Sequence, residues 1–226
     1  MLEWTWRRAA AMSCFDRVII ATDDERIEAE ARRFGADVVR TRADHPSGAD
    51  RVWEAVSSLS GEAPSFVVNL QGDEPRFPVG AVTELTRGLR ADSDSIWTVA
   101  QAIDDPADLA RPQVVKVALT ANHRALYFSR AVIPFVRDTG ASQSVVRYRH
   151  VGVYGYPSEL LRRFVAAPPT HLEQVEALEQ LRALELGMTI RVVLSEEGSP
   201  GIDTPEDLER LRSGYSSAEA FETSAS

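Results

Sequence analysis

The chain has 226 residues, a formal net charge of −9 and 44% hydrophobic residues, values that suit a globular chain with one large α/β domain. The acidic balance argues against a protein that binds nucleic acid. No apolar run approaches the roughly 20 residues of a transmembrane helix, and the first arginines follow the apolar residues, the reverse of a signal peptide. Cys14 is the only cysteine, which excludes internal disulfides and multi-cysteine metal sites. We expect a cytoplasmic protein.

Helical and extended patterns alternate through the first 90 residues. The predicted strands are 17–21, 37–40 and 65–70. Two of the predicted helices are 2–12 and 49–59. Another helix is capped by residues 22–26 and ends at Gly35, and a further one begins at Pro78. Acidic residues and Thr at a helix start, and Gly just past its end, are standard boundary signals. This alternation predicts a parallel sheet with right-handed crossovers.

The pattern changes after residue 94, where short turns separate the apolar segments. Predicted strands are 95–103, 114–119, 125–129, 148–156 and 189–194, the clearest amphipathic helix covers 171–186, and Asp203 starts a final helix. Short turns favour antiparallel or mixed pairing, and therefore an inserted lobe that could cover a site or form a dimer contact. We expect one domain over residues 1–212 and a disordered polar tail over 213–226.

One segment combines a buried strand with a polar turn. Residues 67–75 read Val-Val-Asn-Leu-Gln-Gly-Asp-Glu-Pro, so an apolar run ends abruptly at Asp73 and Glu74. Ligands of open α/β sheets bind at the carboxyl ends of strands, where these carboxylates are expected to lie. The alternative is structural, because turns favour Asp for their own hydrogen bonding.

The string over residues 71–75 resembles the signature of the 3-deoxy-manno-octulosonate (Kdo) cytidylyltransferases. Further blocks resemble that family in the same order, namely 21–26, 41–48 with Asp50 and Arg51, 114–117, 125–134, 150–156, 172–182 and 201–208. The resemblance implies a nucleotide-diphospho-sugar transferase-like (Rossmann-like) three-layer α/β sandwich, with a mixed sheet and a small inserted antiparallel lobe. It also implies a homodimer that converts CTP and Kdo into CMP-Kdo and pyrophosphate with Mg²⁺, for lipopolysaccharide biosynthesis.

The same resemblance assigns the metal and the catalytic role to Asp73 and Asp203. Hard Mg²⁺ is usually held by one or two carboxylates together with phosphate oxygens and water. Each of the two residues follows an apolar strand pattern, so one sheet edge could bring them together. The alternative for Asp203 is the N-cap of the helix that begins there.

Recognition of Kdo requires a cation or an amide for its carboxylate and several groups for its hydroxyls. The residues that the resemblance implies for this role are Gln71, Arg130, His150, Tyr154, Glu179 and Gln180. Structural alternatives stay open: a solvated helix face for Glu179 and Gln180, a half-buried aromatic pair for His150 and Tyr154, and a surface charge for Arg130. Four residues apart on a strand, His150 and Tyr154 are expected to share a face.

Residues 45–48 with Arg51 resemble the segment that recognises cytosine, which implies nucleotide contacts by Ser47, Gly48 and Arg51. Family members usually have Thr where this chain has Ala49, so one hydroxyl is absent. Lys116 is the only lysine, and either a structural role or a role near the site is open.

The start of the chain departs from the family pattern. Family members begin with a strand and a basic phosphate-binding loop before the helix that here starts near Met1. We expect negligible turnover for the 226-residue chain and recovery when upstream codons restore that segment. The alternatives are a cytidylyltransferase for a related acid sugar, an 8-amino Kdo analogue or sialic acid, and a catalytically inactive partner subunit.

Overall fold

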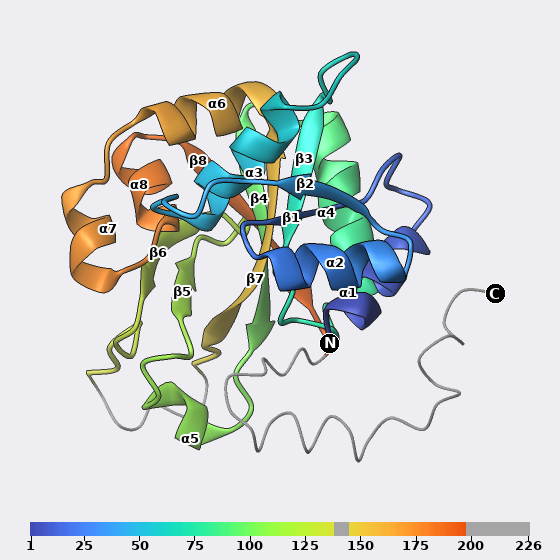
Figure 1. The fold of residues 1–226 in the computed structure, drawn as a ribbon. Coiled ribbons are helices and arrows are strands. Elements are labelled where there is room, and N and C mark those ends of the chain that lie inside the picture. The colour runs from blue at the N-terminus through green and yellow to red at the C-terminus, as the bar shows by residue number, and fades with distance from the viewer. Residues whose placement is uncertain (138–144, 198–226) are drawn as a thin grey trace. The chain divides into compact units, whose positions relative to one another are not determined.

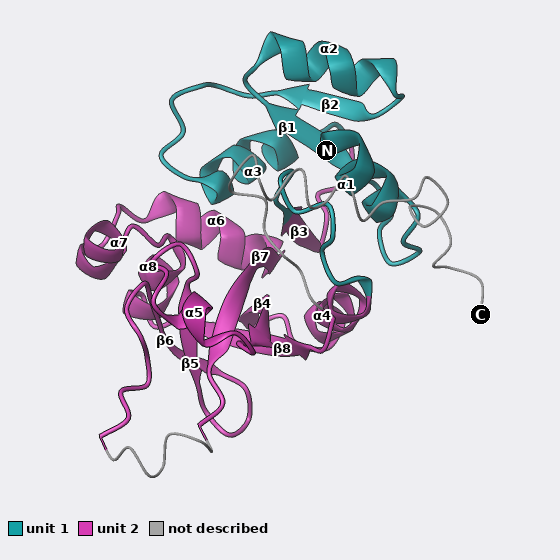
Figure 2. Cartoon of the chain, turned by 90° about the horizontal axis from the view of Figure 1, so that it is seen from below, with its two compact units in different colours: residues 1–60, 70–79, 199–226 teal, residues 61–69, 80–198 magenta. Residues whose placement is uncertain are grey.

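The computed structural model describes residues 1–137 and 145–197. These residues form two compact units (Figure 2): the first contains 1–60 and 70–79, and the second contains 61–69, 80–137 and 145–197. The helix predicted from Asp203 and the tail predicted over 213–226 lie outside the described residues. Among the described helices, none has both the length and the apolar composition that crossing a membrane requires.

The first unit is built from three helices and two short strands. They are α1 (Leu2–Ala10), β1 (Ile19–Thr22), α2 (Glu25–Arg33), β2 (Asp37–Arg40) and α3 (Gly48–Ser57). The two strands pair in parallel, as the alternating order predicts. Asp24 caps α2 by accepting hydrogen bonds from two backbone N–H groups of its first turn, and Gly35 leaves the helix with a φ of 87°. Helix α2 therefore begins and ends at the signals that the sequence predicts.

The core of the first unit is small. Ile20, Ala31 and Ala36 are buried at its centre, and four partly buried side chains pack against them, Leu2, Trp6, Phe34 and Val38. The rings of Trp6 and Phe34 lie 5.3 Å apart, a distance typical of favourable aromatic pairs. This contact fixes α1 against the end of α2.

The second unit contains a six-stranded mixed sheet. Its elements are β3 (Phe66–Leu70), α4 (Val79–Ala91), β4 (Ser95–Ala102), α5 (Pro106–Leu109), β5 (Lys116–Leu119), β6 (Ala125–Ser129), β7 (Tyr148–Pro157), α6 (Ser158–Ala166), α7 (His171–Glu176), α8 (Gln180–Glu185) and β8 (Thr189–Ser195). The order is β6-β5-β7-β4-β8, with β3 also paired to β7 (Figure 1). Only β4 and β8 are parallel among the neighbours along that path, which confirms the predicted mixed sheet.

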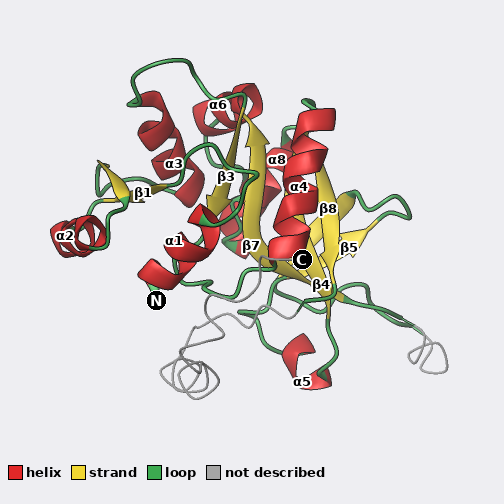
Figure 3. Cartoon of the chain, turned by 90° about the vertical axis from the view of Figure 1, so that its right-hand side faces the viewer, coloured by secondary structure: helices red, strands yellow, loops and turns green. Residues whose placement is uncertain are grey.

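Helix α4 runs alongside the strands of this sheet (Figure 3). A Cβ added to Gly155 of β7 would lie 2.6 Å from the side chains of Leu85 and Leu89, and a Cβ added to Gly88 of α4 would lie 2.5 Å from the ring of Trp97. Both distances are shorter than carbon atoms tolerate, so the close approach of helix and sheet depends on glycine at these two positions.

Three features differ from the sequence expectation. The alternating order predicts one parallel sheet through the first three strands, yet β3 pairs with β7, because the order of elements constrains local crossovers and not the final choice of neighbour. The helix predicted over 171–186 is two short helices, α7 and α8. The short helix α5 and the nine-residue α6 were not predicted, although α6 buries Leu160, Leu161 and Phe164.

Candidate functional site

The segment that follows β3 forms two successive turns. The backbone N–H of Glu74 bonds to the carbonyl of Gln71 at 3.1 Å, and that of Phe77 bonds to the carbonyl of Glu74 at 3.2 Å. Gln71 and Asp73 are exposed on these turns, while Phe77 is fully buried. The turn chemistry expected of this Asp-containing cluster is therefore present, and the Asp73 carboxylate remains accessible.

Helix α1 holds the same turns, which belong to the first unit as it does. The Thr5 hydroxyl donates to the carbonyl of Gly72 at 3.1 Å, and Arg8 Nε donates to the carbonyl of Phe77 at 3.2 Å. The guanidinium of Arg8 also lies 5.4 Å from the centre of the Phe77 ring, within the range of a cation–π contact. The loop that presents Asp73 is consequently fixed at both ends by one helix.

The three residues predicted to contact the nucleotide lie together at the start of α3. Ser47 is the N-cap: its hydroxyl accepts from the Asp50 backbone N–H at 3.4 Å and donates to the Asp50 carboxylate at 2.6 Å. Gly48 is the first helical residue and is exposed. Arg51 Nη1 lies 2.7 Å from both the Asp23 carboxylate and the Thr41 hydroxyl. The exposed Gly48 at this helix N-terminus suits a negatively charged or carbonyl-bearing ligand.

A second contact fixes the loop before α3. Nε2 of His45 contacts the Glu54 carboxylate, and that carboxylate also accepts from the backbone N–H of Arg42 at 3.3 Å. Ala49 is fully buried in the first turn of α3. The Thr that the family usually has at this position would thus bring its hydroxyl into the interior of the unit.

In the second unit, His150 and Tyr154 belong to a row of aromatic rings. Their ring centres lie 5.0 Å apart, Phe128 meets His150 edge-on at 5.3 Å, and Tyr156 continues the row beyond Tyr154 at 5.8 Å. Burial lowers the pKa of His150 to about 3, helped by the charge of Arg149. His150 is therefore neutral near pH 7.

Arg130 follows β6 and is bound almost entirely by backbone carbonyls. Nε donates to the carbonyl of Glu176 at 2.8 Å, Nη1 to that of Pro112 at 3.1 Å, and Nη2 to that of Ala177 at 3.1 Å. Two of these carbonyls end α7, where a cation is favoured by the free carbonyl groups and by the helix dipole. A guanidinium carries five N–H donors, so two N–H groups remain for a ligand.

The predicted helix over 171–186 breaks at Ala177, which has φ 51° and ψ 51°. This left-handed conformation is unfavourable for a residue with a Cβ and needs support from its surroundings. The support is Glu176, whose carboxylate accepts from the Ser129 hydroxyl at 2.6 Å and from the Arg130 backbone N–H at 3.0 Å. The single-helix prediction was wrong because these partners are distant in sequence.

The break changes the surroundings of Glu179 and Gln180. Gln180 is 6% exposed as the first residue of α8, and Glu179 is half-buried, so Gln180 does not lie on a solvated helix face. Arg182 joins the two short helices: it is buried, and its Nε and Nη2 lie 2.8 and 2.5 Å from the Glu173 carboxylate. The guanidinium also packs 4.7 Å from the centre of the Phe164 ring.

A metal site is predicted from Asp73 and Asp203. Asp73 lies in the first unit on an exposed turn, and Asp203 lies outside the described residues. Within the described ranges, no three His, Cys, Asp or Glu side chains cluster closely enough to hold an ion. The accessible carboxylate of Asp73 suits a hard cation that takes oxygen ligands, and its partner stays a prediction.

Known proteins are similar to this chain over most of its length. A family model described as "Cytidylyltransferase" matches residues 1–190. The chain is 43% identical to the 3-deoxy-manno-octulosonate cytidylyltransferase of Thermodesulfovibrio yellowstonii, over 92% of this chain and 85% of the relative. It is 46% identical to the protein of the same name from Syntrophobacter fumaroxidans, over 93% of this chain and 84% of the relative. The chain belongs to the 3-deoxy-manno-octulosonate cytidylyltransferase family.

Solved structures agree with the fold of this family. A CMP:2-keto-3-deoxy-manno-octonic acid synthetase complexed with CTP is similar with a TM-score of 0.85 and 36% identity, covering 94% of this chain and 86% of that one. The 4-diphosphocytidyl-2C-methyl-D-erythritol synthase of Anaerococcus prevotii has a TM-score of 0.61 at 14% identity and supports the fold alone. The nucleotide-diphospho-sugar transferase-like α/β fold expected from the sequence is confirmed.

Lys116, whose role the sequence leaves open, is a structural residue of this family member. Its side chain is fully buried, and Nζ donates to the carbonyls of Arg111, Val114 and Arg130 at 3.0, 2.7 and 2.6 Å. Three donors meet three acceptors, so the ammonium is fully satisfied. Lys116 thereby ties the loop before β5 to the residue that follows β6.

Sequence reasoning missed the residues that hold the candidate site residues in place. Glu176 supports Arg130, and Thr98 of β4 bonds to His150 at 2.8 Å. Nothing local marks either residue, because Glu176 resembles any exposed helix residue and Thr98 any strand residue. Only the pairing of β4 with β7 brings Thr98 to His150.

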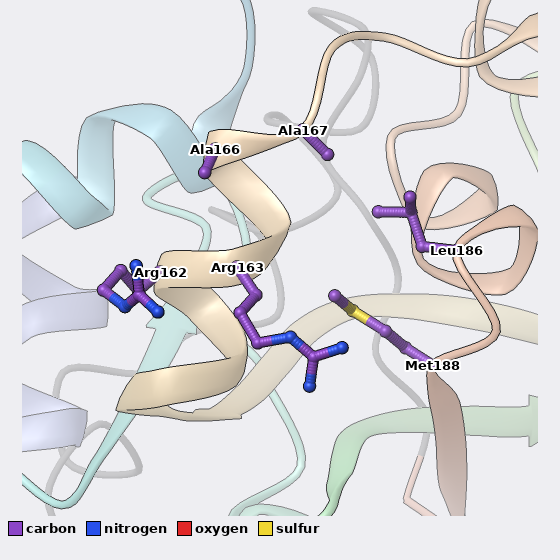
Figure 4. Close-up of a pocket in the computed structure, with 6 residues that line it drawn as sticks. All are labelled: Arg162, Arg163, Ala166, Ala167, Leu186 and Met188. Carbon is purple, nitrogen blue, oxygen red and sulfur yellow. The ribbon is translucent and has the colours of Figure 1, made fainter.

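A shallow pocket of about 320 Å³ lies elsewhere on the second unit, beside α6. Arg162, Arg163, Ala166, Ala167, Leu186 and Met188 line it. The side chain of Arg163 extends toward Met188, while that of Arg162 points away from it (Figure 4). Arg162 is paired with Glu159 at 2.6 Å. The lining contains none of the residues predicted for substrate binding.

Proposed function

We propose that this chain transfers CMP from CTP to Kdo, forming CMP-Kdo and releasing pyrophosphate, as part of lipopolysaccharide synthesis. The observation that carries the proposal is identity of 43–46% over more than nine-tenths of the chain to enzymes of that name. In this reaction the anomeric hydroxyl of Kdo attacks the α-phosphorus of CTP. The protein has little covalent chemistry to perform, so positioning and charge neutralisation dominate.

The start of α3 is proposed to bind the nucleotide. The backbone of exposed Gly48, with the Ser47 and Arg51 side chains beside it, suits the polar edge of a cytosine base. Ser47 and Arg51 are already held by Asp50, Asp23 and Thr41, which reduces the ordering cost when the ligand binds. The similar synthetase of known structure is a complex with CTP, which supports CTP as the nucleotide.

The sugar is proposed to contact six side chains. They are Gln71, Arg130, His150, Tyr154, Glu179 and Gln180. Arg130 has two N–H donors free of the backbone and can bind the Kdo carboxylate with charge-assisted hydrogen bonds. Neutral His150 and buried Gln180 can exchange hydrogen bonds with hydroxyls. Tyr154 is 3% exposed and is proposed to meet the sugar beside His150, as part of the aromatic row.

The proposed cofactor is Mg²⁺, with Asp73 and Asp203 as its protein ligands and as the catalytic carboxylates. Asp73 fits the role because it is exposed and because the described residues give its carboxylate no ion pair. A bound Mg²⁺ would neutralise charge on the triphosphate. We also propose a cytoplasmic location, which the single cysteine of the chain suits.

The reaction is tested by measuring pyrophosphate release and CMP-sugar formation with CTP, Mg²⁺ and each of three acid sugars. The protein is assayed as the 226-residue chain and as the product of the complete reading frame that contains it. We expect the highest kcat/KM with Kdo in the form that is active. Preference for an 8-amino Kdo analogue or sialic acid would reassign the substrate. Absence of turnover in both forms would instead favour an inactive partner subunit.

A homodimer is proposed through β6 and the residues that follow it. β6 is a terminal strand of the sheet, and large apolar side chains are exposed there: Leu126 (60%), Val132 (42%), Phe135 (86%) and Val146 (58%). Exposed apolar side chains that cluster beside a terminal strand mark an association surface. The resemblance to a family of dimers supports a second copy of this chain as the proposed occupant.

The expected result is a dimer mass in light scattering after size-exclusion chromatography, converted to a monomer mass by Phe135→Asp. Ile27→Asp is the matched control, because Ile27 is an exposed apolar residue of α2 in the other unit. A wild-type monomer at micromolar concentration would reject the proposal. So would a Phe135→Asp protein that stays as dimeric as the Ile27→Asp protein.

A further inference from the structure

The pairing of β4 with β7 is irregular at the candidate sugar site. Thr98 pairs with Tyr154, but the next residue of β4, Val99, pairs with Val151. β7 therefore has two extra residues at this point, Gly152 and Val153, which form a bulge. Bulges leave backbone groups without ladder partners and redirect side chains, often beside active sites.

This bulge explains why His150 and Tyr154 touch. Residues four apart on a regular strand are separated by about 13 Å, whereas the two ring centres are 5.0 Å apart. The bulge also leaves the Val153 carbonyl turned toward β4, where the Thr98 hydroxyl lies 2.7 Å from it. Thr98 is fully buried, so water does not compete for this bond.

The hydrogen atoms of this arrangement can be assigned. A threonine hydroxyl has one proton to donate, and a carbonyl can only accept, so the proton lies on the bond from Thr98 to Val153. The same hydroxyl oxygen lies 2.8 Å from Nε2 of His150 and has only acceptor capacity left. His150 must therefore donate from Nε2. Because burial keeps the ring neutral, as its low pKa indicates, Nδ1 is unprotonated and can only accept.

We propose that Thr98 is a positioning residue, which fixes His150 as the Nε2–H tautomer and so makes Nδ1 a hydrogen-bond acceptor for a hydroxyl of the acid sugar. The inference rests on the proposed function for the identity of the sugar. Its consequence is that His150 does not bind the sugar carboxylate, since an acceptor would repel it. Phe128 and Tyr154, packed against the ring, restrain its orientation.

The tautomer is measured without substrate. Long-range ¹⁵N–¹H correlation spectra of the histidine-labelled protein distinguish the two neutral forms, and His150→Gln identifies the signals of this residue among the four histidines. We expect the Nε2–H form in the wild type and in Thr98→Ser, which keeps the hydroxyl. We expect a mixture with the Nδ1–H form in Thr98→Val, which keeps the shape and removes the acceptor.

The kinetic consequence separates positioning from stability. One lost hydrogen bond to the sugar corresponds to a rise of roughly tenfold in its KM, with a smaller change in kcat and an unchanged KM for CTP. Thr98→Val is expected to show this rise and Thr98→Ser little of it. Thr86→Val is the matched control, because Thr86 is equally buried and its hydroxyl donates to the carbonyl of Thr83 at 2.8 Å within α4.

The outcomes of these experiments distinguish the inference about Thr98 and His150 from the proposed reaction. An Nδ1–H tautomer in the wild type overturns the inference, as does a KM in Thr98→Val no higher than in Thr86→Val. Titration of the wild type with Kdo should also move the Nδ1 resonance of His150. Movement without any CMP-Kdo formation keeps the inference and rejects the proposed reaction. Turnover without movement of that resonance rejects the acceptor role and keeps the reaction.

Discussion

Asp73→Asn is expected to lower kcat by roughly a hundredfold to a thousandfold, the loss typical when one preorganised charge-stabilising group is removed from an active site. Asparagine keeps the shape of the side chain and loses the negative charge that a hard cation prefers. The turn itself should survive, because α1 holds it through Gly72 and Phe77, not through the Asp73 carboxylate. The measurement is pyrophosphate release as a function of Mg²⁺ concentration, made in the form of the protein that shows turnover, with thermal unfolding run in parallel.

Asp50→Asn is the matched control for this change. Asp50 is also a carboxylate of the first unit, but it bonds to the Ser47 hydroxyl at the start of α3, and an amide oxygen can still accept that bond. A loss of less than about tenfold is expected, with no change in the Mg²⁺ concentration that gives half-maximal rate. Near-wild-type rates in Asp73→Asn at all Mg²⁺ concentrations would remove Asp73 from the metal site.

Local signals in the sequence were sufficient wherever the structure depends on near neighbours. Asp24 and Gly35 bound α2 as expected, because capping and left-handed exits are decided within a few residues. Period-two and apolar patterns located β2, β3 and β6 to within a residue. The break at Ala177 could not be found in this way, since the neighbouring Glu176 stabilises it through Ser129 and Arg130, which are 47 and 46 residues away from Glu176.

The same distinction applies to the candidate site. Family resemblance pointed to Arg130 and His150 as ligand residues, and the sequence placed both at or near strand ends. Their states depend on distant partners: the carbonyls that hold the Arg130 guanidinium come from residues 112, 176 and 177, and the His150 tautomer depends on a threonine 52 residues away. The sequence can therefore name a candidate ligand residue. The donors and acceptors that this residue has left for a ligand depend on the fold.

Lys116→Met is expected to lower the free energy of unfolding by about 3 kcal/mol, since each of three buried carbonyls loses a hydrogen bond with a net value of roughly 1 kcal/mol. Methionine matches the length of lysine but donates nothing, so three buried carbonyls lose their donor. Burial, together with the nearby charge of Arg130, lowers the pKa of Lys116, so the surroundings disfavour the ammonium, and the three carbonyl acceptors offset that cost. Urea-induced unfolding of the two proteins measures the difference.

Arg162→Met provides the comparison, because it removes a cation from an exposed pair with Glu159 on α6 and should barely change stability. The carbonyl of Arg130 is one of the three that Lys116 binds, so the residue following β6 should also shift in Lys116→Met. We therefore expect a raised KM for the sugar at temperatures where the variant is still folded, with the KM for CTP nearly unchanged. Equal midpoints for Lys116→Met and Arg162→Met would show that the ammonium is not the link between the loop before β5 and Arg130.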